Sequence, residues 1–443
     1  MTEGGITRHI VCFAIPLLLG NLFQQFYNTV DSWVVGNYVS DTAFSAVGTV
    51  GPIINMLINT FLGLSTGASV VISQFYGAKQ HERVQDAVHT SVMMTLILGV
   101  VFTVIGIAMT PLMLNLMETP DSVRPEATQY LIIYFSGIIS LMLYNMGSGI
   151  LRAIGDSQRP FYFLVVSALT NVVLDLVFVL VFKMGVSGVA IATVIAQTLS
   201  AALVLIVLLR AKNCCRLSLK KLRIHRSMLA KILKVGIPAG IENGMFQIGK
   251  LSVSSLTSTL GTAAIAANAV ANTASTFLNI PANAVGMAAL TVVGQCLGAG
   301  EKEQAVYYSR RLMLTAYCGA WVLILSAFLF ANRFVISLFN LSPEAQTMAL
   351  QVMVWFNFVS LFFWPSSFTL PNILRAAGDA RFTMAVSILS MWVFRVGFCY
   401  VMVLGFHGRL LSIWMGMFLD WVFRSLCFFV RFVRGRWMEQ SVI

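Results

Sequence analysis

The chain has 443 residues, of which 58% are hydrophobic and only 10% are charged. A water-soluble domain carries about 25% charged residues, so this composition excludes a soluble globule as well as an intrinsically disordered chain. The formal net charge is +12, but the basic residues form short tracts between apolar runs. That pattern is typical of a membrane protein, and we expect no nucleic-acid partner.

Membrane-spanning helices are the predicted elements, because each needs about 20 mostly apolar residues and the chain offers twelve such runs. The sequence therefore predicts an all-α membrane protein with twelve transmembrane helices. The predicted spans cover residues 10–36, 47–75, 88–113, 127–151, 161–182, 186–209, 232–258, 265–294, 308–331, 346–373, 382–404 and 410–432.

The basic residues are distributed unevenly between the two sets of loops. Of the 29 Lys and Arg residues, most lie in the loops on the side of the two termini. The exceptions are Arg124, Lys183, Arg333 and Arg409 in the opposite loops, and Lys250, Arg395 and Arg424 within spans. Because cytoplasmic loops are enriched in Lys and Arg, we expect a multi-pass protein of the cytoplasmic membrane with both termini in the cytoplasm.

Three sequence motifs occur twice at nearly one offset. VISQFYGAK (71–79) resembles VVGQCLGAG (292–300), LRAIGD (151–156) resembles LRAAGD (374–379), and FAIPLLLGN (13–21) resembles VGIPAGIEN (235–243), at offsets of 221, 223 and 222 residues. This repetition predicts two pseudo-symmetric lobes of six helices, related by an axis along the membrane normal. The predicted lobes are residues 1–209 and 232–443, the second with a cytoplasmic tail, joined by a cytoplasmic basic linker at 210–231.

The remaining motifs favour a transporter over a membrane enzyme. The five histidines lie in or near loops, and the sequence has no HExxH, GxSxG or Walker A motif. No Cys-x-x-Cys or Cys/His ligand spacing indicates a disulfide framework or a zinc site. Two duplicated halves that enclose a cleft would suit alternating access, so we expect a secondary transporter without catalytic residues.

The first span (IPLLLGNLFQQFYNTVDSWVVG), the two repeated helix ends, the two LRAxGD loops and the final DWVFRSLCFFVRFVRGRW resemble the MATE (multidrug and toxic compound extrusion) transporters of the MOP flippase superfamily. The resemblance covers about residues 10–437. It implies a twelve-helix, two-lobe exporter of organic compounds driven by Na⁺ or H⁺ entry. A flippase of lipid-linked oligosaccharides, from the same superfamily, is the alternative. We expect a small organic substrate, a coupling cation, surrounding membrane lipid, no further cofactor and a functional monomer.

Four oxygen-bearing side chains are predicted at one depth in the N-terminal half. Asp31 and Asp175 fall in the outer halves of their spans, Thr193 does so in the next span, and Asn171 shares a helix face with Asp175. Such oxygens could ligate a small hard cation, with no other metal site expected. The set also resembles the cation site of MATE transporters. Hydrogen-bonded packing groups are the alternative interpretation.

The charged residues predicted within the second half each have more than one candidate role. Glu242 is a candidate for coupling or for lining the cavity, and Lys250 and Arg395 add positive charge that could contact acids of the first half, bind an anionic group or extend toward the interface. Asp420 and Arg424 are four residues apart in the last span and are predicted to form a structural ion pair.

Overall fold

The computed structural model describes residues 6–326, 336, 341–440 and 442–443, and this part of the chain contains helices and no strands. Within it, eight helices are long and apolar enough to cross a membrane. Two shorter helices, α4 (Arg124–Ser136) and α5 (Ile138–Ala153), pass the same test as one span bent by 47°. Helices dominate because lipid offers no hydrogen-bond partners, so each backbone group has to be paired within its own segment.

Contacts between residues divide the chain into two units. The N-terminal unit comprises residues 19–236, and the C-terminal unit comprises residues 237–443 together with residues 1–18. The sequence-based division placed residues 1–18 in the N-terminal lobe. Phe13 and Leu17 account for the difference, because both are buried in the hydrophobic core of the C-terminal unit.

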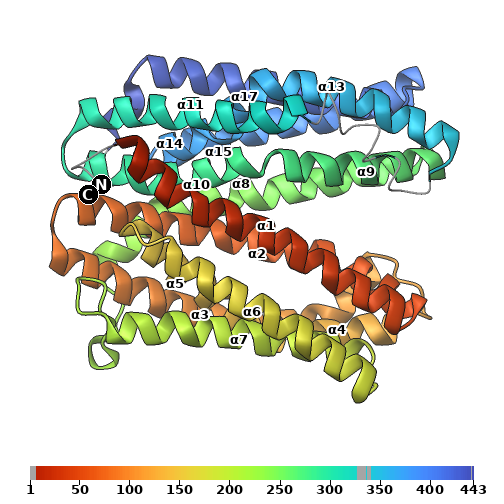
Figure 1. Cartoon of the computed structure of the whole chain (residues 1–443), viewed down its shortest axis with the longest axis horizontal. Coiled ribbons are helices and arrows are strands. Elements are labelled where there is room, and N and C mark those ends of the chain that lie inside the picture. Colours follow the sequence, from red (N-terminus) through yellow and green to blue (C-terminus); the bar gives the residue numbers. More distant parts are fainter. Residues whose placement is uncertain (1–5, 327–335, 337–340, 441) are drawn as a thin grey trace. The chain divides into compact units, whose positions relative to one another are not determined.

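The helices of the N-terminal unit are labelled α1 to α7 in Figure 1. They are α1 (Ile6–Tyr38), α2 (Asp41–Gly77), α3 (His81–Leu116), α4, α5, α6 (Gln158–Leu176), the π-helical turn η1 (Val177–Val181), α7 (Val186–Arg210) and the short turn η2 (Leu219–Lys221).

The C-terminal unit begins within α8 and has more interruptions. Its elements are α8 (Arg226–Ser258), α9 (Thr262–Leu278), α10 (Ile280–Gly298), α11 (Lys302–Ser326), α13 (Pro343–Phe368), α14 (Leu370–Ala376), α15 (Ala380–Ser390), the π-helical turn η4 (Met391–Gly397), α16 (Phe398–Tyr400), the π-helical turn η5 (Val401–Gly405), α17 (Leu410–Val433) and the turn η6 (Arg436–Glu439).

The helices fall on the twelve predicted spans, but three of those spans are broken. The span 127–151 is α4 and α5, the span 265–294 is α9 and α10, and the span 346–373 is α13 and α14. The predicted span 308–331 runs beyond α11 into residues outside the described ranges, and so does Arg333.

Each break places a small or polar residue where the helix is interrupted. At Gly137, between α4 and α5, a Cβ atom would lie 2.5 Å from a methyl group of Val194 on α7, so the glycine allows close packing there. At the other two breaks, side-chain hydrogen bonds link the two interrupted spans to each other. Thr369 donates to the carbonyl of Ala282 at 3.0 Å, and Ser360 donates to Asn279 Oδ1 at 3.4 Å.

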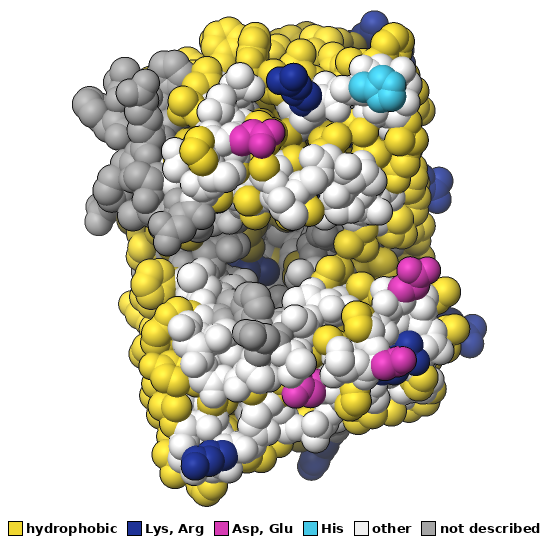
Figure 2. All heavy atoms as spheres, turned by 90° about the vertical axis from the view of Figure 1, so that its right-hand side faces the viewer, with side chains coloured by type: hydrophobic (Ala, Val, Ile, Leu, Met, Phe, Trp, Pro, Cys, Tyr) yellow, Lys and Arg dark blue, Asp and Glu magenta, His cyan; other side chains and the backbone are white. Residues whose placement is uncertain are grey.

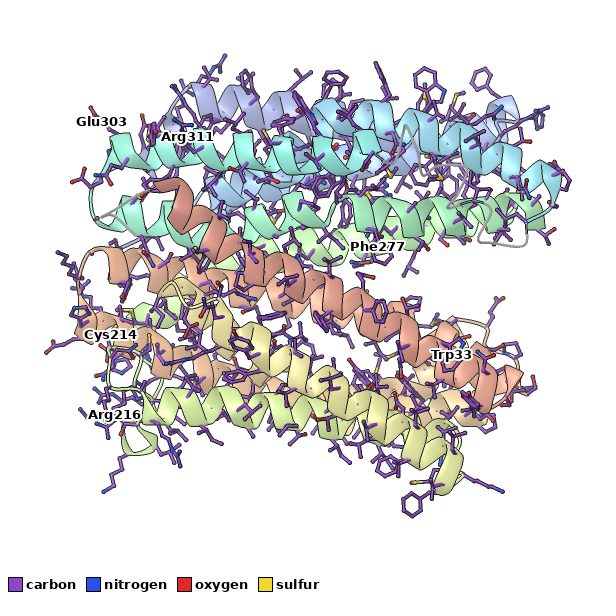
Figure 3. All side chains as sticks on the ribbon, in the orientation of Figure 1. Trp33, Cys214, Arg216, Phe277, Glu303 and Arg311 are labelled. Atoms are coloured by element: carbon purple, nitrogen blue, oxygen red, sulfur yellow. The ribbon has the colours of Figure 1, made fainter. Side chains whose placement is uncertain are left out.

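The basic loops lie at one end of the helices within each unit. In the N-terminal unit, Cys214 and Arg216 of the linker lie at the end opposite Trp33, and in the C-terminal unit Glu303 and Arg311 mark the end at which α11 begins (Figure 3). Figure 2 looks at the end where α1 finishes, and Lys and Arg side chains are scattered singly on it. This separation of charge between the helix ends agrees with the bias in the sequence.

Small residues set the spacing between helices, which leads to a first prediction. A Cβ atom at Gly67 of α2 would lie 2.6 Å from the backbone nitrogen of Gly236 on α8 and closer still to the carbonyl of Ile232. Backbone atoms cannot move aside easily, so Gly67→Ala should destabilise the protein by about 1–3 kcal/mol. Thermal unfolding of the purified protein, followed by size-exclusion fluorescence, measures this as a lower Tm and a lower yield.

Gly51→Ala is the matched control, because Gly51 lies on the same helix and has nothing within 4 Å of the added Cβ. Alanine favours helix formation over glycine, so this variant should be neutral or slightly more stable. Equal melting temperatures for the two variants would contradict close packing at Gly67.

Candidate functional site

The structure brings together the four residues predicted to bind a cation. Asp31 comes from α1, Asn171 and Asp175 from α6, and Thr193 from α7. Asn171 and Asp175 are fully buried, and Thr193 is 4% exposed. With its amide oriented by its neighbours, Asn171 donates to Asp175 Oδ2 at 3.0 Å and accepts from the backbone N–H of Thr193 at 3.2 Å. The spacing of four residues on α6 therefore places both side chains on the face that meets α7.

The two carboxyl groups of this site contact each other. Asp31 and Asp175 are within side-chain hydrogen-bonding contact, although they lie more than a hundred residues apart in the sequence. Two carboxylates this close cannot both stay charged at low free energy unless a proton or a cation lies between them. One oxygen of each, Asp31 Oδ1 and Asp175 Oδ1, is buried without a hydrogen-bond partner. These oxygens without partners are the type of ligand atom that a small hard cation prefers.

Two further residues border this site and were missed by the sequence analysis. Tyr134 of α4 is buried, its hydroxyl contacts the side chain of Gln197 on α7, and it lies close enough to Asp31 for the two groups to interact electrostatically. Gln197 Oε1 is buried without a hydrogen-bond partner. The available signal was the spacing of Gln197, four residues after Thr193 on the same helix face.

The predicted acid of the C-terminal half, Glu242 on α8, lies in a strong ion pair. Arg375 Nη2 of α14 is 2.6 Å from Glu242 Oε1, and Arg424 Nη2 of α17 is 3.8 Å from the same oxygen. Arg375 also donates to Asn372 Oδ1 at 2.8 Å and to Thr383 Oγ1 at 3.3 Å. Arg375 is the arginine of the LRAAGD repeat, so this motif does more than end a helix, because it neutralises a buried acid.

The predicted ion pair between Asp420 and Arg424 is not among the ion pairs of the described residues. Asp420 accepts a short hydrogen bond from Ser390 and lies 3.8 Å from Arg395 Nη1, whereas Arg424 reaches Glu242. Both side chains of α17 point into the unit, but each meets an opposite charge on a neighbouring helix. The i,i+4 rule considers only one helix and could not detect this exchange of partners.

Three cations surround one aromatic ring in the same unit. Lys250 Nζ, Arg395 Cζ and Arg424 Cζ lie 5.2, 5.2 and 5.6 Å from the centre of the Phe246 ring. The structure thus brings Lys250 and Arg395 together around one ring, although two positive charges repel each other. In the described residues, no group of three or more His, Cys, Asp or Glu side chains is arranged to hold a metal ion.

The Glu242–Arg375 pair leads to a second prediction. Glu242→Gln leaves two buried guanidinium groups without their carboxylate, and removing one partner of a buried pair costs about 3–5 kcal/mol. We expect a clear loss of folded protein, measured as yield and Tm after extraction. Adding Arg375→Gln should make the double variant no less stable than Glu242→Gln alone. Additive losses would mean that the two side chains do not depend on each other.

Comparison with known proteins places these features in a family. The MatE family profile matches residues 16–177 and 238–401, one segment in each half. The probable multidrug resistance protein YoeA of Bacillus subtilis is 30% identical over 94% of this chain and 91% of its own length. The probable multidrug resistance protein NorM of Thermotoga maritima is 26% identical over 99% of this chain and 94% of its own.

Solved structures show the same fold. A MOP superfamily transporter from Pyrococcus furiosus has a TM-score of 0.89 and 24% identity, covering 98% of this chain and 96% of its own. A MATE family transporter in an outward-facing conformation has a TM-score of 0.88 and 23% identity, covering 98% and 96%. The twelve-helix architecture in two six-helix lobes, predicted from the sequence, is confirmed. The chain belongs to the MatE family and is a multi-pass membrane transporter, not an enzyme.

Proposed function

We propose that the protein exports small organic compounds across the cytoplasmic membrane in exchange for Na⁺ or H⁺, by alternating access. The relatives support the export of drugs, because several are named multidrug resistance or multidrug export proteins. Their names do not favour the alternative of a lipid-linked oligosaccharide flippase. The coupling cation is the only inorganic ligand in this proposal, with no cofactor and no nucleic-acid partner, and a single chain is the transporting unit.

The observation that supports cation coupling is the contact between Asp31 and Asp175 with one unpaired oxygen on each. A proton can neutralise this pair by bridging the two carboxyl groups. Alternatively, Na⁺ can be held by the same oxygens together with Asn171 and Thr193. Either cation removes the electrostatic repulsion between the carboxyl groups, so its arrival and departure change the packing of α1 against α6.

Coupling requires that cation and drug favour different states of the transporter. A ligand shifts an equilibrium only by its difference in affinity for the two states, so cation binding in one state must oppose drug binding in that state. The helix α1 carries Asp31, and it also contains Pro16, which lacks the backbone N–H of an ordinary helical residue. We propose that neutralising Asp31 lets this helix bend at the weakened turn near Pro16.

Neutral variants of the two acids provide the third prediction. Asp31→Asn and Asp175→Asn have nearly the same shape as the protonated acids, and the amide is less costly to bury than a carboxylate. Both variants should insert and express near normally, while cation-driven export falls at least about tenfold. Efflux of a dye from proteoliposomes, driven by a Na⁺ gradient or a pH gradient in separate experiments, measures the effect and identifies the cation.

Asp121→Asn is the matched control, because the side chain of Asp121 is 98% exposed in a loop of the same unit. It should export like the unmodified protein. Full transport by both site variants, with an unchanged response to Na⁺ and pH, would overturn the coupling site. Movement of a labelled lipid-linked sugar with no dye efflux would instead support a flippase.

The proposed orientation gives a fourth prediction, because Cys214 of the linker should face the cytoplasm. Hydrogen bonds from Cys215 and from His81 lower the pKa of the Cys214 thiol to about 6, although its partial burial acts in the opposite direction. The reactive thiolate therefore predominates above pH 6 and is lost as the pH falls below it. Cys215 is fully buried, so it should not compete for the reagent.

A membrane-impermeant maleimide at pH 7.5 should label the protein in inside-out vesicles but not in intact cells. Labelling should slow as the pH is lowered through 6, and Cys214→Ser should remove the labelling that has this pH dependence. Ready labelling of Cys214 from outside intact cells would reverse the proposed topology.

A further inference from the structure

One face of α8 carries an acid, an aromatic ring and a cation in a row. Glu242, Phe246 and Lys250 follow one another at intervals of four residues, so their side chains lie in a row along the helix. The Phe246 ring in the middle has Lys250, Arg395 and Arg424 within 5.2 to 5.6 Å of its centre. An aromatic ring has only two faces, so at least two of these three cations share one face and lie near each other. We call Phe246 with these three cations the basic cluster.

The acids around the basic cluster do not balance its charge. Glu242 is paired most closely with Arg375, at 2.6 Å, and it reaches Arg424 only at 3.8 Å. The second acid, Asp420, lies 3.8 Å from Arg395. In the described part of the chain, no ion pair involves Lys250. Four cations thus face two acids, which leaves an excess of positive charge at membrane depth. Such an excess is costly unless an anion compensates it.

Hydrogen-bond donors without partners in the basic cluster also indicate that the cluster suits an anion. Arg424 is only 3% exposed, yet its Nε and Nη1 atoms have no hydrogen-bond partner, and neither does Arg395 Nε. Guanidinium N–H groups are strong donors, and leaving them unmet in a buried position is unfavourable. Glu242 Oε2 and Asp420 Oδ2 also have no hydrogen-bond partner, so a ligand would meet both signs of charge, with the cations in excess.

Aromatic rings limit how a ligand can approach the deepest cation. Arg424 lies 4.6 Å from the Phe368 ring centre and 5.8 Å from that of Phe428, in addition to Phe246. Three rings therefore surround this guanidinium group, and its unpartnered N–H groups are what it offers to an oxyanion. The Phe368 ring is itself stacked on Trp364, with centres 4.8 Å apart. Lys250, the third cation of the cluster, is exposed.

We propose that the basic cluster binds the anionic group of transported compounds, namely a carboxylate, sulfonate or phosphate attached to an aromatic body. The oxyanion meets Lys250 first and accepts hydrogen bonds from the unpaired edges of Arg395 and Arg424, while the aromatic body packs on Phe246 and its neighbours. The substrates of this transporter then include organic anions or zwitterions. This inference rests on the proposed export function for the identity of the ligand as a substrate.

Binding to the purified protein tests the proposal without any ion gradient. We would measure the affinity of naphthalene-2-sulfonate by calorimetry in nanodiscs of phosphatidylcholine, with the uncharged naphthalene-2-sulfonamide as the matched ligand. The sulfonate should bind the unmodified protein at least about tenfold more tightly than the sulfonamide. Lys250→Met should remove most of this difference, because it deletes one cation and keeps the length of the side chain.

Two further variants keep the test decisive. Lys250→Arg retains the charge and should retain sulfonate binding, which separates a loss of charge from a loss of structure. Lys302→Met, at the first residue of α11 and outside the cluster, should bind both ligands as the unmodified protein does. Equal affinity for sulfonate and sulfonamide, or sulfonate affinity that Lys250→Met leaves unchanged, would overturn the proposal.

An anionic lipid headgroup carries the same oxyanion, so the experiment needs an arm that separates it from a substrate. Exchange of labelled sulfonate across vesicles of phosphatidylcholine supports a transported ligand. Displacement of the sulfonate by phosphatidylglycerol, together with no exchange, assigns the basic cluster to lipid and overturns the proposal. Asp31→Asn should still bind the sulfonate. If Asp31→Asn and Asp175→Asn leave export intact while sulfonate binding depends on Lys250, the proposed coupling fails and this inference stands.

Discussion

Hydrocarbon cannot solvate a charge, and this single constraint explains most of what distinguishes the two units. Each charged side chain at membrane depth has to find its partner on another helix of the protein. In the N-terminal unit, two acids meet each other and keep unpaired oxygens. In the C-terminal unit, arginines and a lysine outnumber the acids and gather around aromatic rings. One duplicated architecture therefore holds two polar centres of opposite excess charge.

Much of the fold could be predicted because a membrane span is recognisable as a run of about 20 mostly apolar residues. Twelve apolar runs and three repeated motifs were enough to predict the number of helices and the duplication. The breaks were harder to predict, since α9 and α10 together have the length and apolarity of one continuous helix. Pro281 and Pro371 stand just after two of the breaks, which is where proline is tolerated in a helix. Gly137 packs closely on Val194, which belongs to a different span, so its role at the break depends on a distant part of the sequence.

The same holds for the candidate site: some of its residues could be predicted from spacing within one helix, and others depend on which helices are neighbours. Asn171 and Asp175 are four residues apart, so the sequence alone places them on one helix face. Asp31 and Thr193 could be added because they lie at a similar predicted depth in the membrane. The exchange of partners among Glu242, Asp420 and the arginines depends on which helices are neighbours. Residue spacing within one helix cannot predict these neighbours. Asp420 and Arg424 show this best. They are ideally spaced to pair with each other, yet both pair across helix boundaries, because the neighbouring helices supply counter-charges.

The π-helical turns have a consequence for how such a transporter diversifies. Within the N-terminal unit η1 directly follows Asp175 and its helix α6, and within the C-terminal unit η4 contains Arg395, in the span that the repeat makes equivalent. A π turn holds one residue more than an α turn, so it is what remains when a single residue is inserted into a helix. One residue corresponds to about 100° of rotation. Because a π turn takes up the extra residue, the helix on either side keeps its faces and only the side chains within the turn are redirected, so new binding specificities are within reach of single-codon insertions or deletions.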